Sequence, residues 1–238
     1  MQKRHDIMNY TPEFRGILGT IPRNVTITIY GDSGHGKTEF AMRMVRALCL
    51  SGVYVDWISY EQGFGLDMQQ LLQRNDMLSV GSYFSITDPD HKKNPDTTYL
   101  ADLDNKIGKR GSADVFAIDS VQYMSITIAD WLWLKKRHPK KGFIFISHKK
   151  GTLPDGVTAV KIGRDSLVRL LVKNYIAYPE KNRCGGKENY IIWEERARLL
   201  EPKLFEKWDK AKVKTLFTPL ENTDNEHEGE GVIAENED

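Results

Sequence analysis

Five short apolar runs, rich in β-branched residues, alternate with stretches of helical character along the first 150 residues of the chain. A strand that is apolar throughout must be covered on both faces, and helices that connect successive strands supply that cover. The alternation therefore predicts an α/β fold with a central, mostly parallel sheet flanked by helices. We expect strands over Val25–Tyr30, Val53–Ile58, Tyr83–Thr87, Val115–Ile118 and Phe143–Ser147, and helices over Lys37–Cys49, Leu66–Asn75, Thr97–Lys109 and Ile126–Arg137.

The last third of the chain has a different pattern. Three further apolar runs, Leu167–Val172, Asn174–Tyr178 and Tyr190–Trp193, follow one another without room for helices. They predict antiparallel strands added at one edge of the sheet. Residues Glu194–Lys214 are expected to be helical, and Pro202 is expected to kink or divide that helix because proline lacks an N–H donor.

A glycine-rich segment follows the first apolar run and opens the first expected helix. It reads Gly31-Asp32-Ser33-Gly34-His35-Gly36-Lys37-Thr38 and fits the pattern G-x-x-x-x-G-K-[ST]. Glycines let the backbone wrap closely enough for its N–H groups to face phosphate oxygens, and the helix N-terminus adds partial positive charge. Lys37 can neutralise the terminal phosphates, while Thr38 can supply a hydroxyl to Mg²⁺. This segment, the phosphate loop, predicts a site for ATP and Mg²⁺. His35 is interpreted as a tolerated loop side chain rather than a catalyst.

An acid ends the fourth apolar run. The segment Asp114-Val115-Phe116-Ala117-Ile118-Asp119-Ser120 places Asp119 at the carboxyl edge of the expected sheet, beside the phosphate loop. A strand-terminal aspartate alone is a common way to start a turn. Next to a phosphate loop, its carboxylate can hold the shell of Mg²⁺ through water. We therefore expect Thr38 and Asp119 to hold the Mg²⁺ ion.

Hydrolysis of a phosphoanhydride requires a group that orients or deprotonates the attacking water. Glu61 follows the strand expected over Val53–Ile58 and should lie on the same edge as Lys37 and Asp119. It is the best candidate for the catalytic base, the alternative being a surface glutamate. His148 ends the run Phe143–Ser147, where it could sense the terminal phosphate and move the following loop, or could be an ordinary strand-end histidine.

The ordered combination of GDSGHGKT, SYEQG, VFAIDS and FIFISHKKG resembles the RecA-like ATPases, in particular the branch of RadA/Sms, KaiC and the DnaB helicase. The segment Glu180–Gly186 is similar to the family's K-N-R-F-G element, although Cys184 stands where an aromatic residue is frequent. The resemblance spans residues 14–195. It implies a homo-oligomeric ring or filament with nucleotide at the subunit interface, where Lys181 and Arg183 of one subunit reach the nucleotide of its neighbour.

The resemblance also implies that two loops, Gln122–Asp130 and Lys149–Arg164, face a central channel that takes single-stranded DNA. Contacts of this kind go to the nucleic-acid backbone, so binding would be independent of sequence and weakened by salt. Trp131 and Trp133 are interpreted as buried helix residues rather than a stacking platform. The cations expected to bind nucleic acid are Lys149, Lys150, Lys161 and Arg164.

Charge is unevenly distributed along the chain. The chain has 34 Lys and Arg residues and 33 Asp and Glu residues, which gives a net charge of +1. Eight of those acids lie within residues 221–238, where there is no Lys or Arg, so residues 1–220 carry about +9. A basic body favours polyanionic partners, whereas an acidic stretch of this kind is typical of a solvated, disordered segment. We expect one ATPase domain over residues 1–217 and an acidic, disordered tail over residues 218–238.

Composition disfavours several classes of protein. With 40% hydrophobic and 28% charged residues, the chain is typical of globular proteins. No run approaches the roughly 18 apolar residues of a membrane span, and the first residues lack the apolar core of a secretory signal. The two cysteines, Cys49 and Cys184, fit neither a disulfide framework nor a zinc-ligand spacing. These features predict a cytoplasmic protein without membrane contact.

Two functions of different class stay open at this point. The first is a motor core that couples ATP hydrolysis to movement on single-stranded DNA in recombination, repair or replication. The second is a KaiC-like regulatory or assembly ATPase that uses nucleotide to switch protein contacts without binding DNA. A small-molecule kinase would need an arginine-rich lid, and the sequence offers no clear one.

Overall fold

The computed structural model describes residues 6–61, 63–89 and 98–216, with residues 211–216 described as backbone alone. Contacts between residues divide the chain into two units, residues 1–200 and 201–238. In the second unit, helix α8 (Pro202–Leu216) packs its Phe205 and Trp208 rings edge to face. The predicted tail over residues 218–238 lies outside the described residues.

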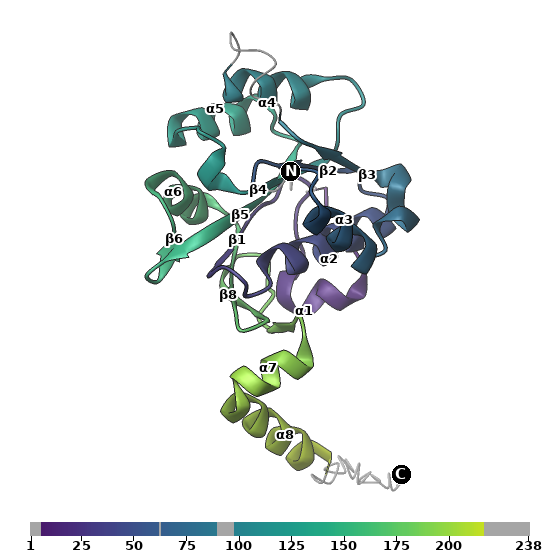
Figure 1. The fold of residues 1–238 in the computed structure, drawn as a ribbon, viewed down its shortest axis with the longest axis vertical. Helices are drawn as coiled ribbons and strands as arrows, with labels where there is room; N and C mark the ends of the chain where they lie inside the picture. The colour runs from purple at the N-terminus through teal and green to yellow at the C-terminus, as the bar shows by residue number, and fades with distance from the viewer. Residues whose placement is uncertain (1–5, 62, 90–97, 217–238) are drawn as a thin grey trace, which may run out of the picture. The chain divides into compact units, whose positions relative to one another are not determined.

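The first unit is built on one twisted sheet with the strand order β3-β2-β4-β5-β1-β7-β8-β9, and the short strand β6 pairs with β5 (Figure 1). From β3 to β7 in this order, neighbouring strands are parallel, whereas β8 and β9 run antiparallel. The prediction of a mostly parallel sheet with antiparallel strands at one edge is confirmed. The strands are β1 (Thr26–Gly31), β2 (Val55–Ser59), β3 (Phe84–Thr87), β4 (Val115–Asp119), β5 (Gly142–Lys150), β6 (Leu153–Pro154), β7 (Val168–Lys173), β8 (Ile176–Asn182) and β9 (Tyr190–Ile191).

Helices cover both faces of the sheet. Apolar side chains of α2 and α3 pack in one cluster, and those of α4, α5 and α6 pack in another. No helix in the described residues combines the length and the apolar composition that a membrane crossing requires. The helices of this unit are α1 (Arg15–Leu18), α2 (Lys37–Leu50), α3 (Leu66–Arg74), α4 (Tyr99–Gly108), α5 (Ile128–Arg137), α6 (Val157–Asp165) and α7 (Glu194–Leu200), with short 3₁₀ helices η1 (Pro12–Phe14), η2 (Met77–Tyr83) and η3 (Val121–Tyr123).

Strand β5 shows why the apolar runs are continuous. Phe143 and Phe145 belong to the cluster beneath α4, α5 and α6, whereas Ile144 and Ile146 belong to the cluster beneath α2 and α3. Successive side chains of a strand point to opposite faces, so a strand covered on both faces must be apolar at every position. Trp131 of α5 packs edge to face on both phenylalanine rings and is fully buried.

Three sequence predictions about this unit are wrong. Trp133 is 47% exposed, because it lies two positions beyond buried Trp131 and so on another side of α5. The segment Lys149–Arg164 is not a loop but the end of β5, the strand β6 and the helix α6. Since α6 connects β5 to β7, the strand over Leu167–Val172 can run parallel to β1 rather than antiparallel.

The end of β1 has no room for a side chain at Gly31. A Cβ built there would overlap the carbonyl oxygen of Val172 in the adjacent strand β7. Gly81 in η2 has open space at the same position and no positive φ. Gly31→Ala should therefore lower the free energy of unfolding, measured with urea, by more than about 2 kcal/mol, because a clash with main chain cannot be relieved by a rotamer change. Gly81→Ala is the matched control, and equal stability of the two variants would contradict this packing.

Candidate functional site

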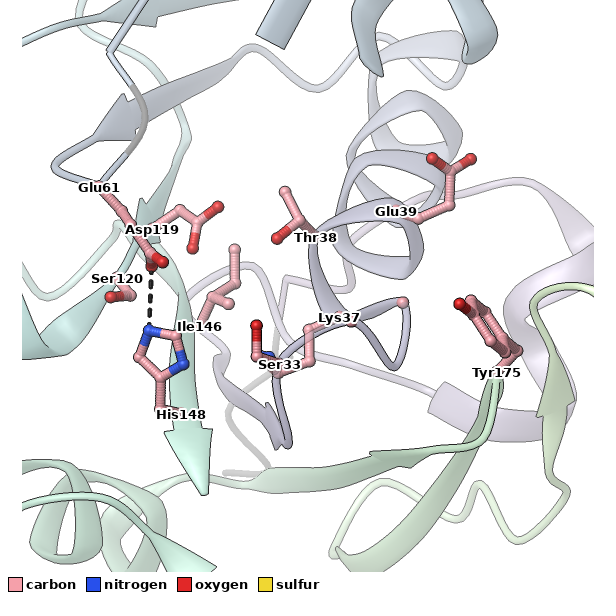
Figure 2. A pocket seen from close by; sticks show the side chains of 12 residues that line it. Ser33, Lys37, Thr38, Glu39, Glu61, Asp119, Ser120, Ile146, His148 and Tyr175 are labelled. Carbon is pink, nitrogen blue, oxygen red and sulfur yellow. Dashed lines mark ion pairs between the residues drawn. The ribbon is translucent and has the colours of Figure 1, made fainter. Parts of the chain in front are cut away.

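The carboxyl ends of four neighbouring parallel strands bring the predicted site residues together. Strand register places Gly31 beside His148, Asp119 beside Ser59 at the end of β2, and Asp119 also beside Ile146. A cavity of about 280 Å³ opens at this edge. Figure 2 shows Glu61, Asp119 and His148 on one side of it and Lys37 with Thr38 facing them. Its lining consists of Ser33, Gly34, Gly36, Lys37, Thr38, Glu39, Glu61, Asp119, Ser120, Ile146, His148 and Tyr175.

The phosphate loop wraps around a lysine that is held inside the protein. Gly34 and Gly36 have φ values of 75° and 94°, which residues with a side chain rarely adopt. Lys37 is 8% exposed, and its Nζ donates to the main-chain carbonyl of Asp32 at 2.8 Å. Burial lowers the pKa of Lys37, and the negative charges of Asp119, Glu61 and Asp32 oppose that shift. The ammonium therefore lies buried among carboxylates at the base of the loop.

His35 fastens the phosphate loop to the turn between β7 and β8. Its Nδ1 accepts a hydrogen bond from the main-chain N–H of Asn174 at 3.2 Å, and its carbonyl accepts from the N–H of Tyr175 at 3.3 Å. Asn174 and Tyr175 both have positive φ, as a tight two-residue hairpin turn requires. His35 thus contacts its own chain, and the turn that it holds delivers the Tyr175 ring to the cavity.

Asp119 is a buried acid with an incompletely balanced charge. Asp119 is 3% exposed, and its carboxylate faces the hydroxyl of Thr38 (Figure 2). Burial, together with the nearby carboxylate of Glu61, raises the pKa of Asp119 to about 7, although Lys37 and Thr38 act in the opposite direction. The peptide bond that follows Asp119 is cis, and Ser120 lines the cavity. A cation beside this carboxylate would stabilise its charged form.

Glu61 and His148 meet across the opening of the cavity. The main-chain N–H groups of Tyr60 and Glu61 both donate to the carbonyl of Asp119, which fixes the end of β2 against the end of β4. Glu61 Oε2 lies 3.2 Å from Nε2 of His148 (Figure 2). The two side chains therefore contact each other, and both line the same cavity.

Several residues that the sequence predicts for the nucleotide site do not line this cavity. Gly31 and Asp32 precede the part of the loop that lines it. Lys181 donates from Nζ to the carbonyls of Arg164 and Ser166, both at 2.6 Å, so its ammonium is held at the end of α6 of its own chain. Arg183 is exposed near the end of β8.

The cations predicted to bind nucleic acid have different surroundings. Lys149 forms an ion pair of 2.8 Å with Asp32 of the phosphate loop, and its proximity lowers the pKa of that aspartate. Lys150 is exposed at the end of β5, while Lys161 and Arg164 are exposed on α6. These positions come from a hairpin and a helix rather than from one mobile loop.

A second cavity, of about 510 Å³, adjoins the first and has mostly apolar walls. Tyr175 and Glu39 line both cavities, and the Tyr175 ring packs edge to face on the ring of Trp193 at 5.5 Å between centroids. No sequence pattern indicates this cavity, because its walls come from α2, α3, the turn between β7 and β8 and the segment after β9. It is lined by Glu39, Arg43, Arg74, Tyr175, Ile192 and Trp193.

Comparison with solved structures identifies the fold. The chain is similar to the flagellar accessory protein FlaH from Methanocaldococcus jannaschii, with a TM-score of 0.57 and 16% sequence identity over 78% of this chain and 93% of that chain. No family model matches the sequence, and the search of curated proteins finds no match either. Together with the sheet order and the phosphate loop, the similarity shows the RecA-like α/β fold of P-loop NTPases.

The raised pKa of Asp119 makes a prediction about stability. A carboxyl that binds its proton more tightly in the folded state lowers the free energy of unfolding of the protein as the pH rises from the unfolded pKa near 4 to the folded pKa of about 7. In protein without nucleotide or divalent metal, Asp119→Asn should be more stable than wild type at pH 8 by about 1–3 kcal/mol, because it removes this cost. The difference should shrink as the pH falls to 4.5.

Urea unfolding at both pH values measures this effect. Asp67→Asn, an exposed aspartate of α3, is the matched control and should show no such pH dependence. A stability difference for Asp119→Asn that is the same at pH 4.5 and pH 8 would contradict the raised pKa.

Proposed function

We propose that this chain is a RecA-like ATPase that binds ATP with Mg²⁺ at the carboxyl edge of its sheet and hydrolyses the terminal phosphoanhydride bond. The observation that supports it most is that Lys37, Thr38, Asp119 and Glu61, which come from three separate parts of the chain, surround one cavity. Phosphoryl transfer depends on positioning and on charge, and these residue types supply both.

Each side chain has a role that its surroundings support. The N–H groups of the phosphate loop and of the first turn of α2 would bind phosphate oxygens, and Lys37 would neutralise the terminal phosphates. Glu61 would orient and deprotonate the attacking water, since it borders the cavity opposite Lys37. His148, in contact with Glu61, would respond to the presence of the terminal phosphate.

The donors around Thr38 fit a magnesium ion. The Thr38 hydroxyl and the Asp119 carboxylate face each other, and the carboxylate is buried beside a second acid, so its environment favours a compensating cation. Thr38 and Asp119 would hold the ion, directly or through water. When bound, Mg²⁺ neutralises charge that develops on the phosphate oxygens.

The second cavity fits the base and the sugar of the nucleotide. It adjoins the phosphate cavity at Tyr175, and its walls are mostly apolar. The aromatic rings of Tyr175 and Trp193 offer faces on which a base can stack. The Arg43 guanidinium donates to the carbonyl of Ile192 at 2.7 Å, which fixes one wall.

Hydrolysis of ATP tests the proposal directly. Glu61→Gln should lower kcat for phosphate release by about 100-fold or more while leaving nucleotide affinity within a few-fold, because it removes the base but not the phosphate loop. Lys37→Ala should weaken nucleotide binding itself. Glu195→Gln, an exposed glutamate of α7, is the control. Full activity of Glu61→Gln would refute the role of Glu61, and an inactive wild type that binds no nucleotide would refute the ATPase.

Single-stranded DNA is the partner that we propose for this ATPase, in recombination, repair or replication. Its support is the charge of about +9 on residues 1–220 and the exposed cations Lys150 at the end of β5 and Lys161 and Arg164 on α6. The proposal includes a homo-oligomer in which Arg183, exposed beyond β8, reaches the nucleotide of a neighbouring subunit.

A regulatory or assembly ATPase of KaiC-like kind is the second candidate. One observation favours it: the ammonium groups of Lys149 and Lys181 are held by Asp32 and by main-chain carbonyls of the same chain rather than presented to a ligand. FlaH, which shares the fold, is named as a flagellar accessory protein.

Turnover with and without DNA separates the two candidates. The motor predicts that single-stranded DNA raises the rate of ATP hydrolysis several-fold at low salt, and that added salt removes the stimulation. Lys150→Ala with Lys161→Ala and Arg164→Ala should abolish it, whereas removal of three charges from α8 (Lys203→Ala, Lys207→Ala and Lys210→Ala) should not. Turnover that single-stranded DNA leaves unchanged at low salt would favour the regulatory ATPase.

A further inference from the structure

Gln122 lies in η3, three residues after Asp119 and away from the lining of the phosphate cavity. Its side-chain amide makes three hydrogen bonds within the fold. Nε2 donates to the hydroxyl of Ser147 and to the main-chain carbonyl of Asp155, both at 2.8 Å. Oε1 accepts from the main-chain N–H of His148 at 3.3 Å. Both donor hydrogens and the acceptor oxygen of the amide are therefore in use.

The partners determine which way this amide points. With nitrogen and oxygen exchanged, the oxygen would face the carbonyl of Asp155 and the nitrogen would face the N–H of His148. Both contacts would be repulsive, so one orientation is favoured. A side chain held in this manner keeps its three partners at fixed distances from one another.

The three partners lie at the base of the β5–β6 hairpin, residues 149–154. The N–H of Asp155 donates to the carbonyl of His148 at 2.8 Å, and the hydroxyl of Ser147 donates to the same carbonyl at 2.9 Å. Asp155 also lies two residues before α6 begins at Val157. Gln122 thus joins the segment after Asp119 to both ends of the hairpin and to the approach to α6.

One member of this network also faces the phosphate cavity. The side chain of His148 lies 3.2 Å from Glu61, and the next residue, Lys149, pairs with Asp32 of the phosphate loop. The hairpin itself exposes Lys150 and Leu153. A movement of the His148 main chain would therefore move the hairpin base or break the hydrogen bonds of Gln122.

We propose that Gln122 is a positioning residue that holds His148 against Glu61 and couples the occupancy of the nucleotide site to the β5–β6 hairpin. The proposal rests on the proposed ATPase function. Gln122 contacts no reacting atom in this scheme. It acts by keeping the main chain of His148 and that of Asp155 in register, so the hairpin and the start of α6 respond together when the contacts of His148 change.

Hydrogen–deuterium exchange of residues 149–156 tests the coupling, with and without a saturating, non-hydrolysable ATP analogue and Mg²⁺. In wild type, nucleotide should change the exchange rate of these amides by about fivefold or more. Gln122→Glu has the same shape but replaces the donor with a carboxylate oxygen that faces the carbonyl of Asp155. It should bind the analogue within about threefold of wild type, show less than a twofold change in hairpin exchange, and lower kcat about tenfold at unchanged KM.

Two further variants complete the experiment. Gln69→Glu introduces the same charge at an exposed position on α3 and should behave as wild type. Gln122→Met keeps the length of the side chain without its amide, so it gives the same test if Gln122→Glu does not fold. A Gln122 variant that binds nucleotide and retains the wild-type exchange response would overturn the proposal. A wild type that hydrolyses ATP without any change in hairpin exchange would also overturn it while the ATPase stands. A wild type that binds no nucleotide refutes both.

Discussion

The parallel register of β2, β4, β5 and β1 is the constraint on which the rest of the structure depends. It sets Asp119 beside the ends of its two neighbours and His148 beside Gly31, so four chain segments leave the sheet at one edge. Parallel strands require crossover connections, and α2, α4, α5 and the segments around them supply these while covering both faces of the sheet. The cavity is a consequence of that geometry, since the strands end where the phosphate loop turns into α2.

The charged groups at this edge of the sheet influence one another strongly. The carboxylates around Lys37 favour its charged form, and Lys37 favours the charged form of Asp119, whereas burial and the neighbouring Glu61 oppose it. Clusters of perturbed titratable groups in a cavity are typical of sites that handle charged substrates. A bound triphosphate would place negative charge beside the Lys37 ammonium, and its metal ion would place positive charge beside the Asp119 carboxylate. Buried charged groups are costly, and this arrangement fits the proposed nucleotide site better than a purely structural role.

Much of this arrangement could be predicted from the sequence, for physical reasons that also explain the failures. Continuous apolar runs indicate strands covered on both faces, and the spacing of glycines before Lys37 requires a strand before it and a helix after it. Helix α6 was predicted as part of a loop, and the glycines before and within it, Gly156 and Gly163, are typical of loops. Gly163 is in fact buried within the helix, where a Cβ would make only ordinary contacts with Arg169 and Thr28. The hydrogen bonds of Gln122 join residues 25 and 33 positions apart and follow no sequence pattern. The same is true of the second cavity, whose walls meet only in the folded chain.

The most direct test of a nucleotide site at this edge is calorimetric titration of a non-hydrolysable ATP analogue, with Mg²⁺, into the wild-type protein and into Lys37→Ala. Wild type should bind one equivalent per chain, and omission of Mg²⁺ should weaken the binding. Lys37→Ala should lose most of the affinity, because the buried ammonium at the base of the loop is gone. Absence of binding to wild type, or equal binding by both proteins, would contradict a nucleotide site built around Lys37.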